Sequence, residues 1–128
     1  MKIRPMKTIV SLLLALTPAL AHADKDLQKG SAWNCKKDPV VHIVNGDGKY
    51  TFTGECKTIS VSGGENTLTI ASVETLEVDG AENTIIVGTV GTINVDGNDN
   101  KITWKKALTG NKPTLKDQGE KNTITQAK

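Results

Sequence analysis

Thr58–Glu74 reads TISVSGGENTLTIASVE, Thr75–Gly91 reads TLEVDGAENTIIVGTVG, and Thr92–Leu108 reads TINVDGNDNKITWKKAL. The three segments are contiguous and equal in length. Aliphatic residues recur at the second and fourth positions of each segment, a glycine at the sixth and an asparagine at the ninth. A fixed period, here of about 17 residues, predicts a repeat fold in which successive units stack on one another.

Each unit carries two short runs of alternating apolar residues, for example Ile59 and Val61, then Leu68 and Ile70. This alternation predicts two short strands per unit, each with one buried face. Between the runs lies Gly-x-x-Asn, where glycine can supply a positive φ and asparagine can bond nearby backbone. We expect these residues to stack as a corner ladder that satisfies the backbone groups of the turns. The ladder comprises Gly63, Asn66, Gly80, Asn83, Gly97, Asn100, Gly119 and Asn122.

The repeat continues less regularly in both directions. Val41–Phe52 matches Ile59–Ile70 at a slightly longer interval, and Gly119–Ile124 matches Gly97–Ile102 at a longer one, with the extra residues in Lys106–Pro113. The sequence therefore predicts a small, single-domain, all-β parallel solenoid of about five coils with irregular outer coils. An antiparallel meander or sandwich is the alternative, because Gly-Gly-Glu-Asn can turn a hairpin. Hairpins, however, do not require identical residues at a fixed period.

Two cysteines, Cys35 and Cys56, are separated by slightly more than the length of one repeat. In an oxidising compartment such a pair predicts a disulfide, and a metal or redox pair is the rival interpretation. The bond would pin the N-terminal end of the solenoid, where strand edges are exposed.

The N-terminal residues 1–23 are typical of a cleavable signal peptide. A basic start precedes the apolar run Thr8–Leu16, and Ala21-His22-Ala23 forms a small-x-small site with cleavage expected after Ala23. The run is too short to cross a bilayer, which needs about 20 apolar residues. We therefore expect a periplasmic or secreted protein without a membrane anchor after cleavage. Residues 24–40 would form an N-terminal cap segment and residues 41–128 the solenoid.

The charge of the chain changes once residues 1–23 are removed. The whole chain carries a formal +2, but the remainder has 13 lysines, no arginine and 14 acidic residues, and so a formal −1. This balance, together with export, argues against a nucleic-acid partner. The expected partner is an unknown protein or a cell-envelope glycan.

The order of these motifs resembles an exported bacterial family, the domain of unknown function 3060. The resemblance covers roughly Cys35 to Ile124. It rests on the repeated V-x-G-x-x-N-x-I-x-(I/V) pattern, an aromatic strand Ile102-Thr103-Trp104, a Gly-x-x-Pro loop ending at Pro113, and a closing G-x-x-N-T-I. The resemblance implies a secreted, repeat-built β domain and carries no assigned activity. Asp117 departs from the pattern at an apolar position, which puts the first strand of the last coil in doubt.

No pattern in the sequence predicts a catalytic, cofactor or metal site. A triad of Ser60 or Ser62 with His42 and Asp79 has no support in its spacing. Calcium is the more serious possibility, suggested by Asp96–Asn100 and Asp79–Asn83, which place oxygen ligands at stacked corners but lack the known calcium-loop patterns. Exposed threonine columns are a further candidate surface, although threonine also favours exposed strands. They are Thr58, Thr75 and Thr92, then Thr67, Thr84, Lys101 and Thr123, beside Thr69, Ile86, Thr103 and Thr125.

We therefore expect an exported, non-catalytic binding or structural module of the periplasm or cell surface. The alternative is a periplasmic inhibitor or immunity protein directed against an enzyme toxin. A polysaccharide-acting enzyme is disfavoured, because so few coils leave little room for a cleft and arginine clamps are absent.

Overall fold

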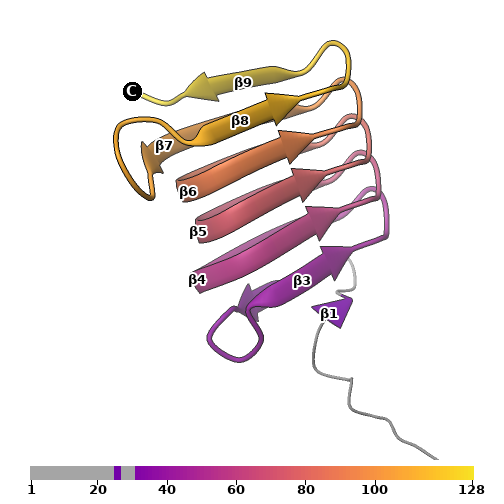
Figure 1. Ribbon diagram of the computed structural model, residues 1–128. Coiled ribbons are helices and arrows are strands. Elements are labelled where there is room, and N and C mark those ends of the chain that lie inside the picture. The colour runs from indigo at the N-terminus through magenta and orange to yellow at the C-terminus, as the bar shows by residue number, and fades with distance from the viewer. Residues whose placement is uncertain (1–24, 27–30) are drawn as a thin grey trace, which may run out of the picture.

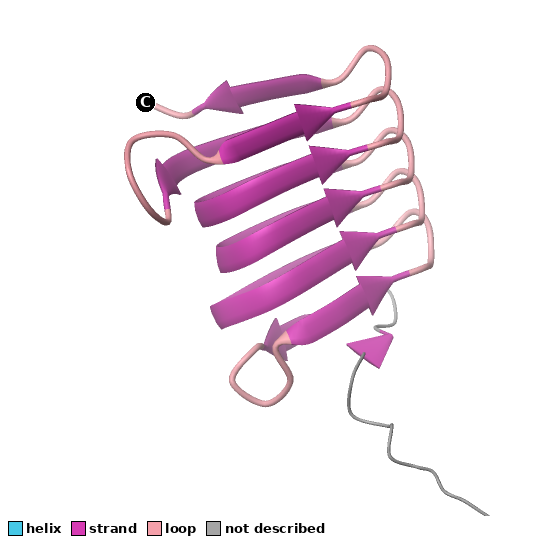
Figure 2. Ribbon diagram, in the orientation of Figure 1, coloured by secondary structure: helices cyan, strands magenta, loops and turns pink. Residues whose placement is uncertain are grey.

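The computed structural model describes residues 25–26 and 31–128, and all regular elements in these ranges are β-strands (Figure 2). The predicted signal peptide, 1–23, lies outside the described residues, as does part of the predicted cap. No helix in the described part of the chain has the length and apolarity needed to cross a membrane. The strands are β1 (Lys25–Asp26), β2 (Ala32–Asn34), β3 (Val40–Ile43), β4 (Lys49–Val61), β5 (Thr67–Val78), β6 (Thr84–Val95), β7 (Lys101–Ala107), β8 (Thr114–Asp117) and β9 (Thr123–Gln126).

All strand pairs are parallel, and the strands stack as rungs along one axis (Figure 1). β5 and β6 pair with one constant step, from Thr67 opposite Thr84 to Val78 opposite Val95, which we call the regular step. The step is slightly longer between β3 and β4, where Val41 lies opposite Ile59. It is longest between β6 and β8 and between β7 and β9, and we call it the long step there. The predicted parallel β-solenoid is thus confirmed, and the antiparallel alternative is wrong.

The rungs differ from the predicted pairs of short strands. β5 runs unbroken from the second strand of one repeat into the first strand of the next. Leu68 and Ile70 point inward on the first half and Leu76 and Val78 on the second, with buried Val73 at the bend between them. β5 remains one continuous strand through the bend, so the chain changes direction while staying hydrogen-bonded to its neighbours. The solenoid makes about four turns, where the repeats predicted about five, because the outer repeats supply only parts of turns.

The core is a thin column of aliphatic side chains enclosed by the rungs. Equivalent residues stack directly, as in the series Val41, Ile59, Leu76 and Ile93, all at 0% exposure. Aromatic residues appear only toward the ends of the described core, with Tyr50 and Phe52 in β4 and Trp104 in β7. Burying a Val, Leu or Ile side chain contributes roughly 1.5–3 kcal/mol, so this column is the main source of stability.

The N-terminal end is closed by the predicted disulfide between Cys35 and Cys56, whose Cα atoms lie 5.0 Å apart. Both cysteines are buried, and Cys56 continues the core column beneath Val73. β2 lies within the segment predicted as a cap, yet it pairs with β4 in the parallel register of the solenoid. The solenoid therefore begins earlier than residue 41.

The C-terminal end contains the loop that the longer interval of the sequence predicted, between Ala107 and Thr114. β8 follows this loop and pairs with β6, so the doubt raised by Asp117 is removed: Asp117 lies opposite Val95 in a formed strand. All four residues of β8 are exposed, which explains why an acidic side chain is tolerated there. Asp117 Oδ1 accepts hydrogen bonds from Gly119 N and from Asn122 Nδ2.

Candidate functional site

The turns on one edge of the solenoid are built around asparagines that point inward. Asn66, Asn83 and Asn100 are each 1% exposed. Asn83 Nδ2 donates to the carbonyl oxygen of Gly63 at 3.0 Å, and its backbone N donates to Asn100 Oδ1 at 2.9 Å. Asn66 and Asn100 repeat this pair of bonds, and Asn122 Nδ2 donates to Gly97 O. The ladder satisfies the turn backbone, so its polar atoms are engaged in the fold rather than offered to a ligand.

The expected reason for the turn glycines is corrected by the structure. The residue with a positive φ is the one before each asparagine: Glu65, Glu82 and Asp99 have φ of 59–60°. Glycine is required instead by close approach, because a Cβ on Gly80 would overlap the carbonyl oxygen of Gly63 in the rung below. Gly63, Gly97 and Gly119 each meet a carbonyl oxygen in the same way. The expected left-handed tolerance of asparagine is not used either.

The threonine columns lie on the outer surface, as the alternation predicted. Thr67, Thr84 and Thr123 share one column with Lys49 and Lys101, and all five are exposed. The adjacent column contains Ile86, which is 44% exposed and interrupts the polar array. On the other face, Thr58, Thr75 and Thr92 are half-buried. No single face is therefore a continuous threonine array.

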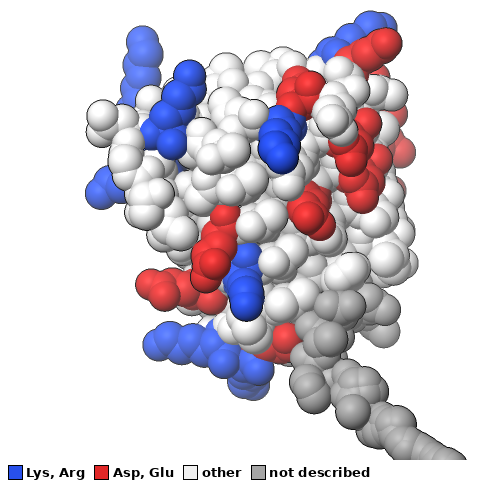
Figure 3. Space-filling view, viewed as in Figure 1, with Lys and Arg blue, Asp and Glu red and all other residues white. Residues whose placement is uncertain are grey.

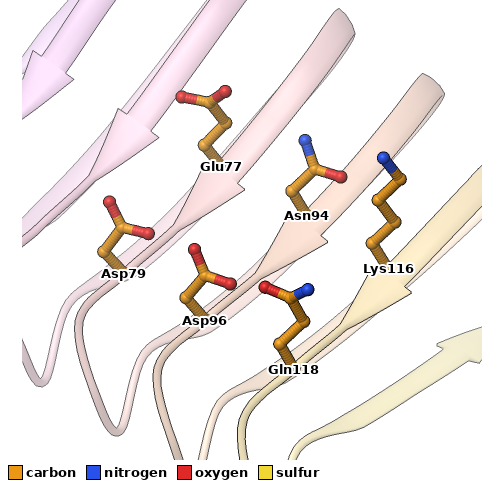
Figure 4. Close-up of a pocket in the computed structure, with 6 residues that line it drawn as sticks. All are labelled: Glu77, Asp79, Asn94, Asp96, Lys116 and Gln118. Carbon is orange, nitrogen blue, oxygen red and sulfur yellow. The ribbon is translucent and has the colours of Figure 1, made fainter.

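A groove lies on the face opposite the exposed threonine columns. It encloses about 320 Å³ and is lined by Glu77, Asp79, Asn94, Asp96, Lys116 and Gln118. The first row, Glu77, Asn94 and Lys116, comes from paired positions of β5, β6 and β8. The second row, Asp79, Asp96 and Gln118, comes from the residues that follow these strands (Figure 4). We call this feature the acidic groove.

Stacking of like charges sets the electrostatics of the acidic groove. Partial burial raises the pKa of Asp79, and the negative charges of Asp96 and Glu77 raise it further, as does a side-chain hydrogen bond with Asp96. Glu77 Oε1 accepts a hydrogen bond from Ser60 Oγ at 3.0 Å. Asn94 Oδ1 is buried and has no hydrogen-bond partner among the described residues. The groove thus presents carboxylates beside the ammonium group of Lys116.

This arrangement suits hydrogen-bond acceptance better than triad catalysis or calcium binding. The serine, histidine and aspartate triad considered from the sequence is not supported. Ser60 lies opposite His42 on the neighbouring strand, and its hydroxyl donates a hydrogen bond to Glu77. A triad needs the histidine between the nucleophile and the carboxylate. In the calcium motif, Asp96 faces the groove while Asn100 points into the ladder, so the two do not converge. No group of three or more metal-binding side chains occurs in the described ranges.

Sequence reasoning singled out Asp79 and Asp96 but missed Glu77, Asn94, Lys116 and Gln118. The regular step aligns Glu77 with Asn94 and could have placed them together. Lys116 and Gln118 join them only through the long step across the C-terminal loop. The signal for a third of the groove lining therefore lay in the irregular repeat, which the sequence left in doubt.

The fold and the constant spacing within the chain define a repeat-built parallel β-solenoid. A family model described as "protein of unknown function (DUF3060)" matches residues 44–88 and 65–121. These segments together cover more than half of the 128 residues, so the chain belongs to this family, as the sequence resemblance implied. Neither the curated proteins nor the solved structures contain a match to the chain.

Proposed function

We propose that this protein is an exported, non-catalytic binding module of the cell envelope. The signal-like segment 1–23 and the Cys35–Cys56 disulfide support export, because disulfides persist in oxidising compartments. The stacked rungs support a binding role, because they hold surface side chains at fixed spacings on a rigid frame. Cleavage after Ala23 leaves the disulfide-closed solenoid free of a membrane anchor in this proposal.

The observation that carries the proposal is the acidic groove. Its carboxylates accept hydrogen bonds, and Lys116 donates them. Rungs repeat at about 4.8 Å, so the two rows offer acceptors at regular intervals along the solenoid axis. A hydroxyl-rich chain, such as a cell-envelope glycan, has the complementary donors.

Co-sedimentation with purified peptidoglycan sacculi tests this proposal. Asp96→Asn and Asp79→Asn should each weaken binding about tenfold, because each exchanges an acceptor oxygen of the groove for a donor. Asp47→Asn is the matched control, since Asp47 is an exposed aspartate at a turn outside the groove and its loss should leave binding unchanged. The proposal fails if the wild-type protein remains in the supernatant or if all three variants bind equally.

The non-catalytic part of the proposal has a separate test. Labelled sacculi incubated with the protein should release no soluble fragments over hours. Time-dependent release that Asp79→Asn or Asp96→Asn abolishes would instead make the groove an active site.

A periplasmic inhibitor or immunity protein is the second candidate, favoured by the charge of the solenoid body. Residues 38–100 contain ten acidic residues and two lysines, a formal −8. Asp47, Glu65, Glu82 and Asp99 share one exposed position of successive turns. Such a line of carboxylates complements a basic active-site cleft. The test is whether a neighbouring gene encodes an enzyme toxin whose activity the purified protein blocks; its absence across genomes of the family would exclude this role.

A further inference from the structure

The two strands at the C-terminal end of the solenoid each have one unpaired edge. β8 pairs with β6 and β9 pairs with β7, and no other strand of the described residues pairs with either of them. Thr123 N and Ala127 N donate to carbonyl oxygens of Asn100 and Trp104 on the β7 side. Because alternate residues of a strand point their backbone groups to opposite neighbours, those of Ile124 and Gln126 face outward. An edge of this kind is a template for an added strand.

Apolar surface accompanies this edge. Leu115 of β8 stacks on Ile93 and is 37% exposed, and Ile124 of β9 stacks on Ile102 and is only partly buried. In the rungs below, the equivalent side chains are fully covered by the next rung. One further strand would cover Ile124 in the same way.

Lysines surround the open end. Residues 101–128 contain seven lysines and two acidic residues, a formal +5 against −8 for residues 38–100. Figure 3 shows blue side chains at the β8–β9 end and again at the opposite end, with most of the red ones over the middle of the solenoid. Those nearest to the two edge strands in the chain are Lys112, Lys116, Lys121 and Lys128, all exposed. These lysines therefore favour the docking of a negatively charged strand.

The same charges exclude a second copy of this chain as the occupant. Two C-terminal ends placed together would oppose their lysines. The N-terminal end carries exposed Lys36 and Lys37, and there β1 already pairs with β3, so head-to-tail stacking also opposes like charges. Lysines at an edge prevent pairing with identical chains, and they favour partners of opposite charge.

We propose that the C-terminal end of the solenoid docks an extended acidic segment of a partner protein, which adds a parallel or antiparallel strand to the outer edge of β9. Main-chain hydrogen bonds to Ile124 and Gln126 supply affinity, an apolar side chain of the segment covers Ile124, and glutamate or aspartate side chains pair with Lys121 and Lys128. This surface is separate from the acidic groove and takes a ligand of opposite charge.

A peptide titration of the isotope-labelled protein tests this inference. The probe is a synthetic ten-residue peptide in which valine alternates with glutamate, and the control peptide has lysine in place of glutamate. The glutamate peptide should shift the amide resonances of Ile124 and Gln126 and slow their hydrogen exchange, and the lysine peptide should do neither. Loss of binding as salt rises from low to physiological concentration is also expected.

Charge-reversal variants locate the interaction. Lys121→Glu with Lys128→Glu should weaken binding of the glutamate peptide about tenfold, because two ion pairs become repulsive. Lys49→Glu with Lys57→Glu is the matched control, since both lysines are exposed on β4, which is separated from β9 by several rungs, and it should bind normally. Thermal melting of both double variants verifies the fold. The inference is overturned if the glutamate peptide fails to protect Ile124 and Gln126, if both peptides bind equally, or if the two double variants behave alike. Binding of sacculi by the acidic groove is measured independently, so either proposal can fail alone.

Discussion

The middle rungs β4–β6 and the C-terminal end β7–β9 are built from the same repeat, yet they differ in the step between rungs and in burial. In the middle, the regular step keeps each side chain above its equivalent, and the core positions are 0–2% exposed. At the end, the long step splits the rung into β7 and β8, and β8 is exposed throughout. A constant repeat length thus keeps the apolar side chains buried. The inserted loop at the C-terminal end instead leaves strand edges and charged side chains accessible.

Asp117 shows how the end is terminated. It occupies the position of buried Val95, one rung further along, but its carboxylate accepts a hydrogen bond from the last asparagine of the ladder, Asn122. In the middle of the ladder, the side-chain nitrogen of Asn83 instead donates to Oδ1 of the next asparagine, Asn100, which also accepts from the backbone N of Asn83. A polar residue that would disrupt the middle therefore satisfies the ladder where the ladder stops.

The largest expected effect comes from placing an aspartate in the middle rungs. Val78→Asp should destabilise the protein by more than about 4 kcal/mol, because the site is 0% exposed and offers the charge no partner. Urea denaturation followed by circular dichroism measures the loss. Thr69→Asp is the control on the exposed side of the same strand and should cost less than about 1 kcal/mol. Equal losses would contradict the inward register of Val78.

Removing the disulfide should have the next largest effect. Cys35→Ser with Cys56→Ser should lower the free energy of unfolding by about 3 kcal/mol, because the bond closes a loop of 21 residues in the unfolded chain. The urea midpoint of the double variant, compared with that of the wild type under oxidising conditions, provides the measurement. A wild type that shows no change when its disulfide is reduced would contradict this result.

The asparagine ladder should matter more in the middle than at the end. Asn83→Ala leaves the buried Asn66 N–H and Gly63 carbonyl without partners and should cost about 2–3 kcal/mol. Asn122→Ala should cost about 1 kcal/mol, because its turn is partly exposed to water. The two variants can be compared by thermal and urea unfolding. A larger loss at Asn122 would reverse the comparison between the two regions.

The smallest expected effect is a pH dependence from the acidic groove. The pKa of Asp79 is raised in the folded state, so the folded protein binds this proton more tightly than the unfolded chain. Stability should therefore fall as pH rises from the ordinary aspartate pKa through the raised one. Asp79→Asn should remove this slope and be slightly more stable than the wild type above that range. An unchanged slope in the variant, measured by urea unfolding from pH 3 to 7, would argue against Asp79 as its source.

The sequence predicted the parts of the molecule that follow the fixed period. The series Ile59, Leu76 and Ile93 gave the core register, and the asparagine spacing placed the ladder. The role of the glycines was not predicted correctly. Close approach to the rung below and a positive φ both require glycine, so the sequence alone does not distinguish them. The acidic groove was missed, because Asn94 meets Lys116 only across the C-terminal loop.

The parallel stacking of rungs at the regular step is the central claim, and nuclear Overhauser contacts between backbone protons test it most directly. The account predicts contacts between Ser72 and Thr89 and between Leu76 and Ile93, which are paired on neighbouring rungs. Strong Hα–Hα contacts between Val61 and Leu68, which flank the Gly-Gly-Glu-Asn turn, would indicate an antiparallel hairpin and contradict the solenoid.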